Sequence, residues 1–184
     1  RAYWVFRGNI PAVHPPSTGR ATPVTNAASS LTRYSAAAAT SVAARLQRIE
    51  DREAIEKLLI VYGQLLDEQD LAGYSKLFAA NGVWEGGIGS ATGPQEIFTM
   101  LETVLGRTAP DAYGSDYHLM SDIIIDVDGD TATSWSRWTW LVEGADGKPM
   151  PQRAGHYEDK LVRENGQWRF LHRLTVTELP TPAK

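Results

Sequence analysis

The sequence contains no cysteine among its 184 residues, and this absence excludes several kinds of site. Disulfide bonds, thiolate nucleophiles and zinc or iron–sulfur centres with cysteine ligands all need that side chain. A chain without cysteine is compatible with the cytoplasm or the periplasm, so the composition does not decide between these two compartments.

Long apolar runs and excess positive charge are missing as well. No apolar run approaches the roughly 20 residues that a membrane-spanning helix needs. The formal net charge is -4 and the pI is about 5.6, whereas a nucleic-acid-binding domain usually presents a basic face. Hydrophobic residues make up 42% of the chain and charged residues 22%, which is typical of a globular domain with its own core. We therefore expect one folded domain with neither a nucleic-acid nor a membrane partner.

Several motifs that carry chemistry are also absent. The four histidines show none of the HxH, HxxxH or HExxH spacings of metal sites, and no GxSxG segment marks a serine nucleophile. The glycine-rich stretch 86–89 lacks the Lys-Ser/Thr of a phosphate-binding loop. Residues 126–130 superficially suggest a calcium loop but lack its later glutamate, so we interpret them as a turn. The sequence predicts no metal site.

Composition divides the chain into three parts. Residues 1–43 are rich in Ala, Ser, Thr and Pro and show no sustained period of 2 or 3.6, which predicts a flexible leader or linker. The apolar opening at residues 2–6 is too short for a secretory signal, and Arg7 interrupts it. We expect the domain itself over residues 44–179 and a short tail over 180–184.

Helical periodicity dominates the first half of the expected domain. From Val42 onward, apolar residues recur at steps of three and four, as on one stripe of an amphipathic helix. They are Leu46, Ile49, Ile55, Leu58, Leu59, Tyr62, Leu65 and Leu66. Shorter helices are predicted from about Leu71 to Ala79 and from Gln95 to Leu105, the latter preceded by a proline near its first turn.

The second half of the chain shows strand patterns separated by turns. A short strand is predicted at 83–85, and four long ones at 118–127, 131–142, 153–163 and 167–177. The pairs Asp128-Gly129 and Asn165-Gly166 are typical of tight hairpin turns. Helices followed by hairpin-linked strands predict an α+β fold with helices on one face of an antiparallel sheet.

Side-chain alternation assigns faces to two of these strands. In the first strand, His118, Met120, Asp122 and Ile124 should share one face, and the residues that alternate with them should lie on the other face. In the second, Trp138 and Trp140 should lie on one face, with Trp135 and Leu141 on the opposite one. We expect Trp138 and Trp140 to line a pocket, and Trp135 and Leu141 to lie at an interface.

Three polar residues are candidates for proton transfer. Asp67 lies at the end of the long helix, where the helix dipole disfavours a carboxylate, so it needs a partner or a task unless it is simply solvated. Tyr62 lies on the apolar stripe, and its hydroxyl must find a partner if it is buried. His118 opens a strand near a rim, and a neutral histidine beside a carboxylate can act as acid or base near neutral pH. His156 and His172 are the rival histidines.

Ordered pieces of the chain resemble the SnoaL-like domains of the nuclear transport factor 2-like superfamily. The resemblance extends from Ile49 to about Leu174 and covers roughly two thirds of the chain. The matching pieces are Ile55–Tyr62, Leu66-Asp67, Leu77–Ala79, Gly93–Ile97, His118-Leu119, Val127–Ala132, Gly155–Asp159 and Gly166–Phe170.

This resemblance implies a curved sheet wrapped around helices as a cone with a deep internal pocket. Such proteins include polyketide cyclases, scytalone and bile-acid dehydratases, ketosteroid isomerases, aromatic-compound lyases and non-catalytic binders, and most need no cofactor. In dehydratase-like members a Tyr and an Asp on the first helix and a His on a strand are catalytic, and Tyr62, Asp67 and His118 fall on those positions. A second His or Asp of some members has no clear match, and Trp138 or Trp140 would occupy that wall.

The resulting hypothesis is a cofactor-independent lyase acting on a small hydrophobic or aromatic hydroxylated substrate. It would be a dehydratase or a formaldehyde-releasing carbon–carbon lyase, with Asp67, His118 and Tyr62 as its acid–base groups. An isomerase or polyketide cyclase with the same residues, or a non-catalytic small-ligand binder, remains an alternative. The expected substrate-binding residues are Trp84, Met100, Tyr113, Met120, Trp138, Trp140 and His156. The resemblance also implies a homodimer formed through the exposed face of the sheet.

Overall fold

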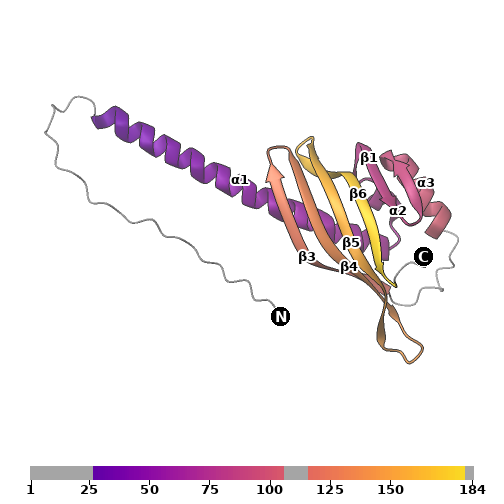
Figure 1. The fold of residues 1–184 in the computed structure, drawn as a ribbon. Helices are drawn as coiled ribbons and strands as arrows, with labels where there is room; N and C mark the ends of the chain where they lie inside the picture. Colours follow the sequence, from indigo (N-terminus) through magenta and orange to yellow (C-terminus); the bar gives the residue numbers. More distant parts are fainter. Residues whose placement is uncertain (1–26, 106–115, 181–184) are drawn as a thin grey trace. The chain divides into compact units, whose positions relative to one another are not determined.

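A computed structural model describes residues 27–105 and 116–180, with side chains from residue 41 onward. The chain divides into two units, Arg1–Ser41 and Val42–Lys184. The second unit contains the sheet, two short helices and most of the long helix (Figure 1). Tyr113, one of the expected substrate-binding residues, lies outside the described residues.

The described part of the chain contains three helices. Helix α1 spans Ala27–Asp67, so it begins well before Val42, where the apolar stripe predicted its start. Alanine has the highest intrinsic helix propensity, and an alanine-rich stretch can therefore be helical without apolar periodicity. Helix α2, Leu71–Ser75, is shorter than predicted, because the chain turns at once into a strand; helix α3 spans Gly93–Leu105. The division of the chain into leader, domain and tail remains a prediction.

Six strands form one curved, mixed sheet in the order β2-β1-β6-β5-β4-β3. The strands are β1 (Phe78–Gly86), β2 (Gly89–Thr92), β3 (Asp116–Asp128), β4 (Thr131–Glu143), β5 (Pro149–Glu164) and β6 (Gln167–Leu179). All neighbours are antiparallel except β1 and β6. The expected antiparallel sheet is therefore confirmed with one exception: β1 and β6 are parallel, because the hairpin from β5 fixes the direction in which β6 enters beside β1.

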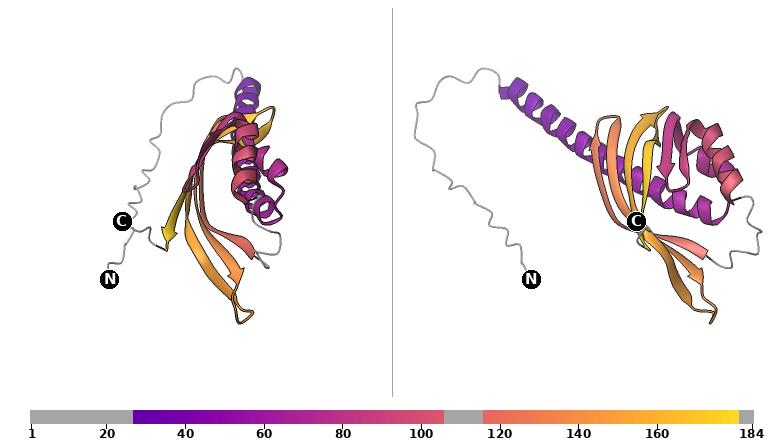
Figure 2. Two further views of the ribbon diagram at one scale, coloured as in Figure 1. Left: turned by 90° about the vertical axis from the view of Figure 1, so that its right-hand side faces the viewer. Right: turned by 45° about the vertical axis from the view of Figure 1, so that its right-hand side comes forward.

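Helices cover one face of the sheet, as the α+β prediction required (Figure 2). The core between them contains Ile55 and Leu59 of α1, Ile97 of α3, and Leu161 and Phe170 of the sheet, each no more than 1% exposed. Burying each such side chain contributes about 1.5–3 kcal/mol. Among the described residues, no helix combines the length and apolar character that crossing a membrane requires.

Hairpin turns and a bulge in β3 determine which residues of β3 and β6 face the helices. Asn165 and Gly166 both have positive φ, 51° and 77°, as the predicted Asn-Gly hairpin turn requires. In β3 the pairing with β4 shifts between Ser121 and Ile124, and Asp122 has a φ of 51°. This bulge reverses the alternation, so Ile124 is 58% exposed instead of sharing a face with His118.

Candidate functional site

His118 and Asp67 are joined by two hydrogen bonds between the end of α1 and the start of β3. Asp67 Oδ1 lies 2.6 Å from His118 Nδ1, and Asp67 Oδ2 accepts the backbone N–H of His118 at 2.9 Å. The side chains are 17% and 15% exposed. The carboxylate at the unfavourable end of the helix dipole therefore has a partner, and the pair remains within reach of a small molecule.

The contact with Asp67 determines which imidazole nitrogen is free. An ionised carboxylate only accepts hydrogen bonds, so the Nδ1 that faces Asp67 carries a proton. In the neutral ring, Nε2 then holds the lone pair and can accept a proton from a substrate. The second bond, to the backbone N–H, fixes the carboxylate relative to β3 and prevents it from turning away from the ring.

Gly63 allows β3 to approach the helix at this point. It lies one turn before Asp67, and a Cβ atom there would already be 3.7 Å from His118 Cβ and 3.9 Å from Met120 Cγ. A larger side chain would separate helix from strand. Sequence reasoning did not identify this glycine as part of the site.

Two tryptophans of β4 form an aromatic wall beside His118. The Trp140 ring stacks on the His118 ring with centroids 6.2 Å apart and an interplanar angle of 12°, and Trp138 lies 6.4 Å away. In the register, Trp140 is opposite His118, and Trp138 is opposite Met120. The structure therefore brings Trp138, Trp140 and Met120 together with His118, as the strand alternation predicted.

Polar contacts hold the two indoles in place. Trp140 Nε1 donates to Asp116 Oδ2 at 2.7 Å, and Trp138 Nε1 donates to the carbonyl of His156 at 3.3 Å. Gly155 lies under the Trp138 ring, where an added Cβ would be 1.9 Å from the carbonyl oxygen of Val176 and 2.9 Å from the indole. The indole can lie across β5 only because residue 155 has no side chain.

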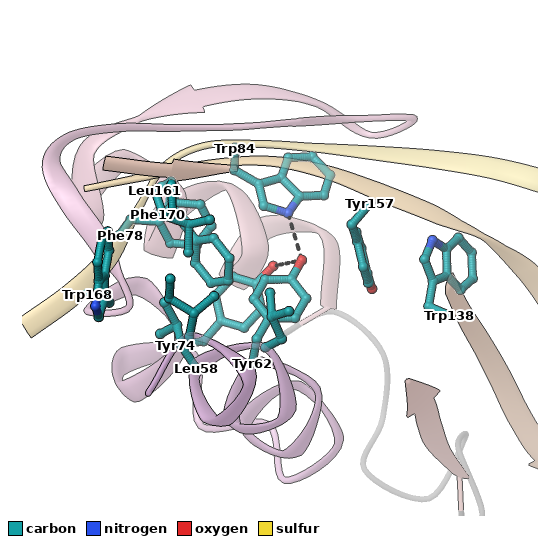
Figure 3. Packing of buried hydrophobic residues seen from close by; sticks show 14 of the residues in the cluster. Leu58, Tyr62, Tyr74, Phe78, Trp84, Trp138, Tyr157, Leu161, Trp168 and Phe170 are labelled. Carbon is teal, nitrogen blue, oxygen red and sulfur yellow. Dashed lines mark hydrogen bonds between the residues drawn. The ribbon is translucent and has the colours of Figure 1, made fainter. Parts of the chain in front are cut away.

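Tyr62 lies deeper in the core than the histidine–carboxylate pair. Its hydroxyl accepts hydrogen bonds from Trp84 Nε1 at 3.1 Å and from the Tyr74 hydroxyl at 2.5 Å, and the residue is 2% exposed (Figure 3). Burial, followed by the neighbouring Tyr62, raises the pKa of Tyr74 well above its ordinary value. Tyr62 and Trp84 thus belong to a buried hydrogen-bonded group, while His118 bonds to Asp67.

Tyr157 of β5 connects these two groups, and sequence reasoning missed it. Its ring packs edge-on against Tyr62 at 5.5 Å and tilted against Trp138 at 6.0 Å (Figure 3). Within the described residues its hydroxyl has no hydrogen-bond partner. Burial raises the pKa of Tyr157, with smaller contributions from Tyr62 and the charge on Asp67. It is therefore a neutral hydroxyl with unused hydrogen-bonding capacity. Its place in the matching piece Gly155–Asp159 was the available signal.

A fully buried ion pair, Arg173 with Asp159, packs against Tyr62 and Tyr157 from the sheet side. Arg173 Nε and Nη2 donate to the two oxygens of Asp159 at 2.7 and 2.8 Å, and Ser134 Oγ donates to Asp159 at 2.7 Å. Both charged side chains are fully buried. The guanidinium carbon lies 3.9 Å from the Tyr62 ring centroid and 4.1 Å from that of Tyr157. Burial alone would lower the pKa of Arg173, but the charge and hydrogen bonds of Asp159, together with the neighbouring Tyr62 and Tyr157, outweigh it and raise that pKa.

Two of the expected site residues lie elsewhere. His156 lies on the outer face of the sheet, where it bonds to Glu178 at 2.9 Å and stacks on Trp135. Met100 packs against the core from α3. The rival His172 bonds to Glu85 at 3.1 Å and borders an outer groove of about 450 Å³, which Trp135 also lines. None of these residues contributes to the hydrogen bonds of His118. Adjacent residues of a strand lie on opposite faces, so His156 points outward where its neighbour Tyr157 is buried.

The described residues contain no group of three or more histidine and acidic side chains that could hold a metal ion. What they do bring together is one imidazole nitrogen able to accept a proton, a carboxylate that orients it, and aromatic surface on one side. This arrangement can move a proton to or from a small molecule that stacks against the indoles.

Comparisons with known proteins agree with this architecture. A family model described as a SnoaL-like domain matches residues 47–174. Among curated proteins, no sequence matches the chain. A solved NTF2-like protein with a cystatin-like fold from Novosphingobium aromaticivorans is 25% identical, with 77% of this chain and 90% of that one covered and a TM-score of 0.65.

Two further solved structures share the fold. A candidate scytalone dehydratase from Novosphingobium aromaticivorans is 25% identical over 72% of this chain and 87% of its own, with a TM-score of 0.59. LinA is 20% identical over 73% of this chain and 90% of its own, with a TM-score of 0.62. At this level of identity the likeness to LinA concerns the fold alone.

Proposed function

The chain belongs to the family of SnoaL-like domains, and from this premise we propose that it is a cofactor-independent lyase acting on a small hydrophobic or aromatic hydroxylated compound. The superfamily includes dehydratases and isomerases, and a candidate scytalone dehydratase is among the structural neighbours. The observation that carries the proposal is the doubly hydrogen-bonded pair of Asp67 and His118 beside an indole wall.

In this proposal His118 Nε2 is the general base. It removes a proton from the carbon adjacent to the one that bears the leaving hydroxyl, and the electrons of that C–H bond form the new double bond while the C–O bond breaks. Asp67 stabilises the imidazolium that results, and the departing hydroxide takes up a proton to leave as water. In the formaldehyde-releasing variant, the base removes the proton of a CH2OH group, and the O–H electrons form the C=O bond of formaldehyde. The electrons of the broken carbon–carbon bond then form the new double bond as the hydroxyl on the neighbouring carbon leaves as water. Acid–base catalysis of this kind contributes typically 10²–10⁴-fold to the rate.

We assign the two tyrosines different roles. Tyr62 has an oxygen that already accepts two hydrogen bonds, and its task is to hold the aromatic group in position. Tyr157 has unused hydrogen-bonding capacity within the described residues and touches the Trp138 ring, so its hydroxyl is the group that donates to the leaving oxygen. This assignment replaces Tyr62 as the acid while keeping a tyrosine in that role.

The substrate stacks on Trp138 and Trp140 in this account. Trp138 is 6% exposed, and Trp140 is partly buried and parallel to the His118 ring. A flat or compact apolar molecule beside these indoles would bring its hydroxylated carbon towards the imidazole. Such a site selects by shape and apolar contact, with few polar groups to fix orientation.

The test is a panel of aryl and polyketide alcohols, assayed for release of water or formaldehyde. We expect His118→Ala and Asp67→Asn to lower turnover about 10²–10⁴-fold on any compound that the wild type converts. His172→Ala is the matched control, because that histidine also pairs with a carboxylate but lies on the outer face. Equal turnover by wild type and both site variants would refute the assignment.

The products separate the remaining alternatives. A rearranged product of unchanged mass would make the protein an isomerase or cyclase using the same pair. Binding of panel members without conversion, unaffected by His118→Ala, would favour a small-ligand binder.

A further inference from the structure

Helix α1 presents a second apolar stripe that does not belong to the core. Val42, Leu46 and Ile49 are 62%, 53% and 61% exposed, and every residue from 42 to 50 is exposed. Their spacing of four and three residues places them on one face of the helix. The same helix buries Ile55 and Tyr62 on the opposite face, because about 100° of rotation per residue places these two groups roughly half a turn apart.

This stripe differs from scattered surface hydrophobics, which need no explanation. Three large aliphatic side chains adjoin one another, and none of them is part of the core cluster. Most helical stability in proteins comes from packing an amphipathic face rather than from propensity. A helical segment whose apolar face is entirely exposed therefore indicates a partner for that face.

We infer that the stripe pairs with the same stripe of a second copy of this chain, the two helices running parallel. Charge supports this occupant and this direction. Arg45 and Glu50 flank the stripe on opposite sides and are five residues apart, which is the spacing of ion pairs between neighbouring parallel helices. Parallel pairing thus places Arg45 of each copy beside Glu50 of the other. Antiparallel pairing would instead bring Arg45 against Arg45 or Arg52 of the second copy.

The charges further along the stripe determine where the pairing ends. Glu53 and Glu56 continue the same helix face beyond Ile49, and both are exposed. In a parallel pair they would meet their own equivalents, and like charges in such positions are destabilising. The contact is therefore confined to the helix before Glu53. The inference does not depend on the proposed catalytic activity.

Cysteine cross-linking tests both the contact and its direction, and the chain is suited to it because it contains no cysteine. In a parallel pair, Val42→Cys and Ile49→Cys should each form a disulfide-linked dimer with their own equivalents, since a disulfide needs Cβ atoms about 3.5–4.5 Å apart. Ile88→Cys, at an exposed apolar position between β1 and β2, is the control and should remain single. Linkage of neither helix variant, or of the Ile88 variant equally, would overturn the inference.

Sedimentation gives the second test and distinguishes other interfaces. Leu46→Glu should halve the mass of the wild-type assembly, whereas Ile88→Glu should leave it unchanged. Arg45→Glu should weaken association, and Arg45→Glu combined with Glu50→Arg should restore it. A homodimer through the outer face of the sheet predicts instead that Leu46→Glu keeps the wild-type mass. That result, or a wild type that sediments as one chain, would contradict pairing through α1.

Discussion

Two of the hydrogen-bonded pairs that join a carboxylate to a basic side chain differ in how deeply they are buried. Asp159 and Arg173 are fully buried, with both carboxylate oxygens and two guanidinium nitrogens engaged. Asp67 and His118 are also doubly bonded, but they remain partly exposed, and among the described residues the second ring nitrogen of His118 has no partner. A fully buried pair can hold the surrounding side chains in place, whereas only the partly exposed pair can exchange a proton with a ligand.

The surroundings of the two pairs explain why they differ. Three aromatic rings, of Tyr62, Tyr157 and Phe170, surround the Arg173 guanidinium and exclude water from it. Among the described residues, the aromatic rings beside His118 are those of Trp138 and Trp140. The first arrangement costs desolvation that only an intact pair offsets. The second arrangement leaves His118 accessible to a ligand. The following variants distinguish a contribution to stability from a contribution to proton transfer.

The largest expected effect on stability follows from breaking the fully buried pair of Asp159 and Arg173. Asp159→Leu leaves the buried Arg173 charge without a counterion and should lower the free energy of unfolding by about 3–5 kcal/mol in urea denaturation. The double variant Asp159→Leu/Arg173→Met removes both charges and should recover most of this loss. If Asp159→Leu were as stable as the wild type, the ion pair would not contribute to the stability of the fold.

Asp51 should give the next largest effect and a pH dependence. This buried residue of α1 accepts hydrogen bonds from Arg163, Gln47 and Trp168, and the bond from Arg163 lowers its pKa. Asp51→Asn should lower the free energy of unfolding by about 1.5–3 kcal/mol at neutral pH. Because the folded-state pKa is depressed, this contribution is present above the ordinary carboxyl pKa and lost as the pH falls through the lowered value.

Urea denaturation at a series of pH values measures that contribution. The difference between wild type and Asp51→Asn should shrink steadily on acidification below about pH 4. A difference that stays constant into strong acid would mean that the carboxylate charge of Asp51 contributes nothing.

Gly155→Ala tests the wall next to His118. The added methyl group would collide with the carbonyl of Val176 and the Trp138 ring, and it should cost about 1–3 kcal/mol. Near-ultraviolet circular dichroism should report the displaced indole. Gly87→Ala is the control for the loss of a glycine, because a Cβ there meets nothing within 4 Å and the backbone has no positive φ at that residue. An unchanged near-ultraviolet spectrum would indicate that Trp138 does not depend on Gly155.

The exposed pair should contribute least to stability. Asp67→Asn keeps the shape of the side chain and should lower the free energy of unfolding by about 1 kcal/mol, despite its large expected effect on turnover. A loss as large as that of Asp159→Leu would assign Asp67 to the structural group and remove the contrast.

Local patterns predicted most of the fold. Apolar steps of three and four predicted α1, a proline near the first turn predicted α3, and strand patterns with Asn-Gly and Asp-Gly turns predicted the four long strands. Strand β2 and the bulge at Asp122 were missed, because a four-residue edge strand and a single extra residue leave little periodic signal. The parallel entry of β6 beside β1 depends on a long-range contact that no local pattern contains.

The site was predictable only in part, for a similar reason. His118 and Asp67 were identified from position and family resemblance, and the structure joins them directly. Arg173 and Asp159 were missed because charged residues in a strand are usually solvent-exposed, and only their cross-strand register reveals the pair. The environment of Tyr157 likewise depends on side chains from three separate elements.

The ¹⁵N resonances of the His118 ring test the central claim most directly. If Asp67 holds the imidazole by its Nδ1 proton, the neutral ring should show a protonated Nδ1 and an unprotonated Nε2 in the wild type. Asp67→Asn should abolish this preference. A neutral His118 that carries its proton on Nε2 would leave no free base facing the substrate and would contradict the account.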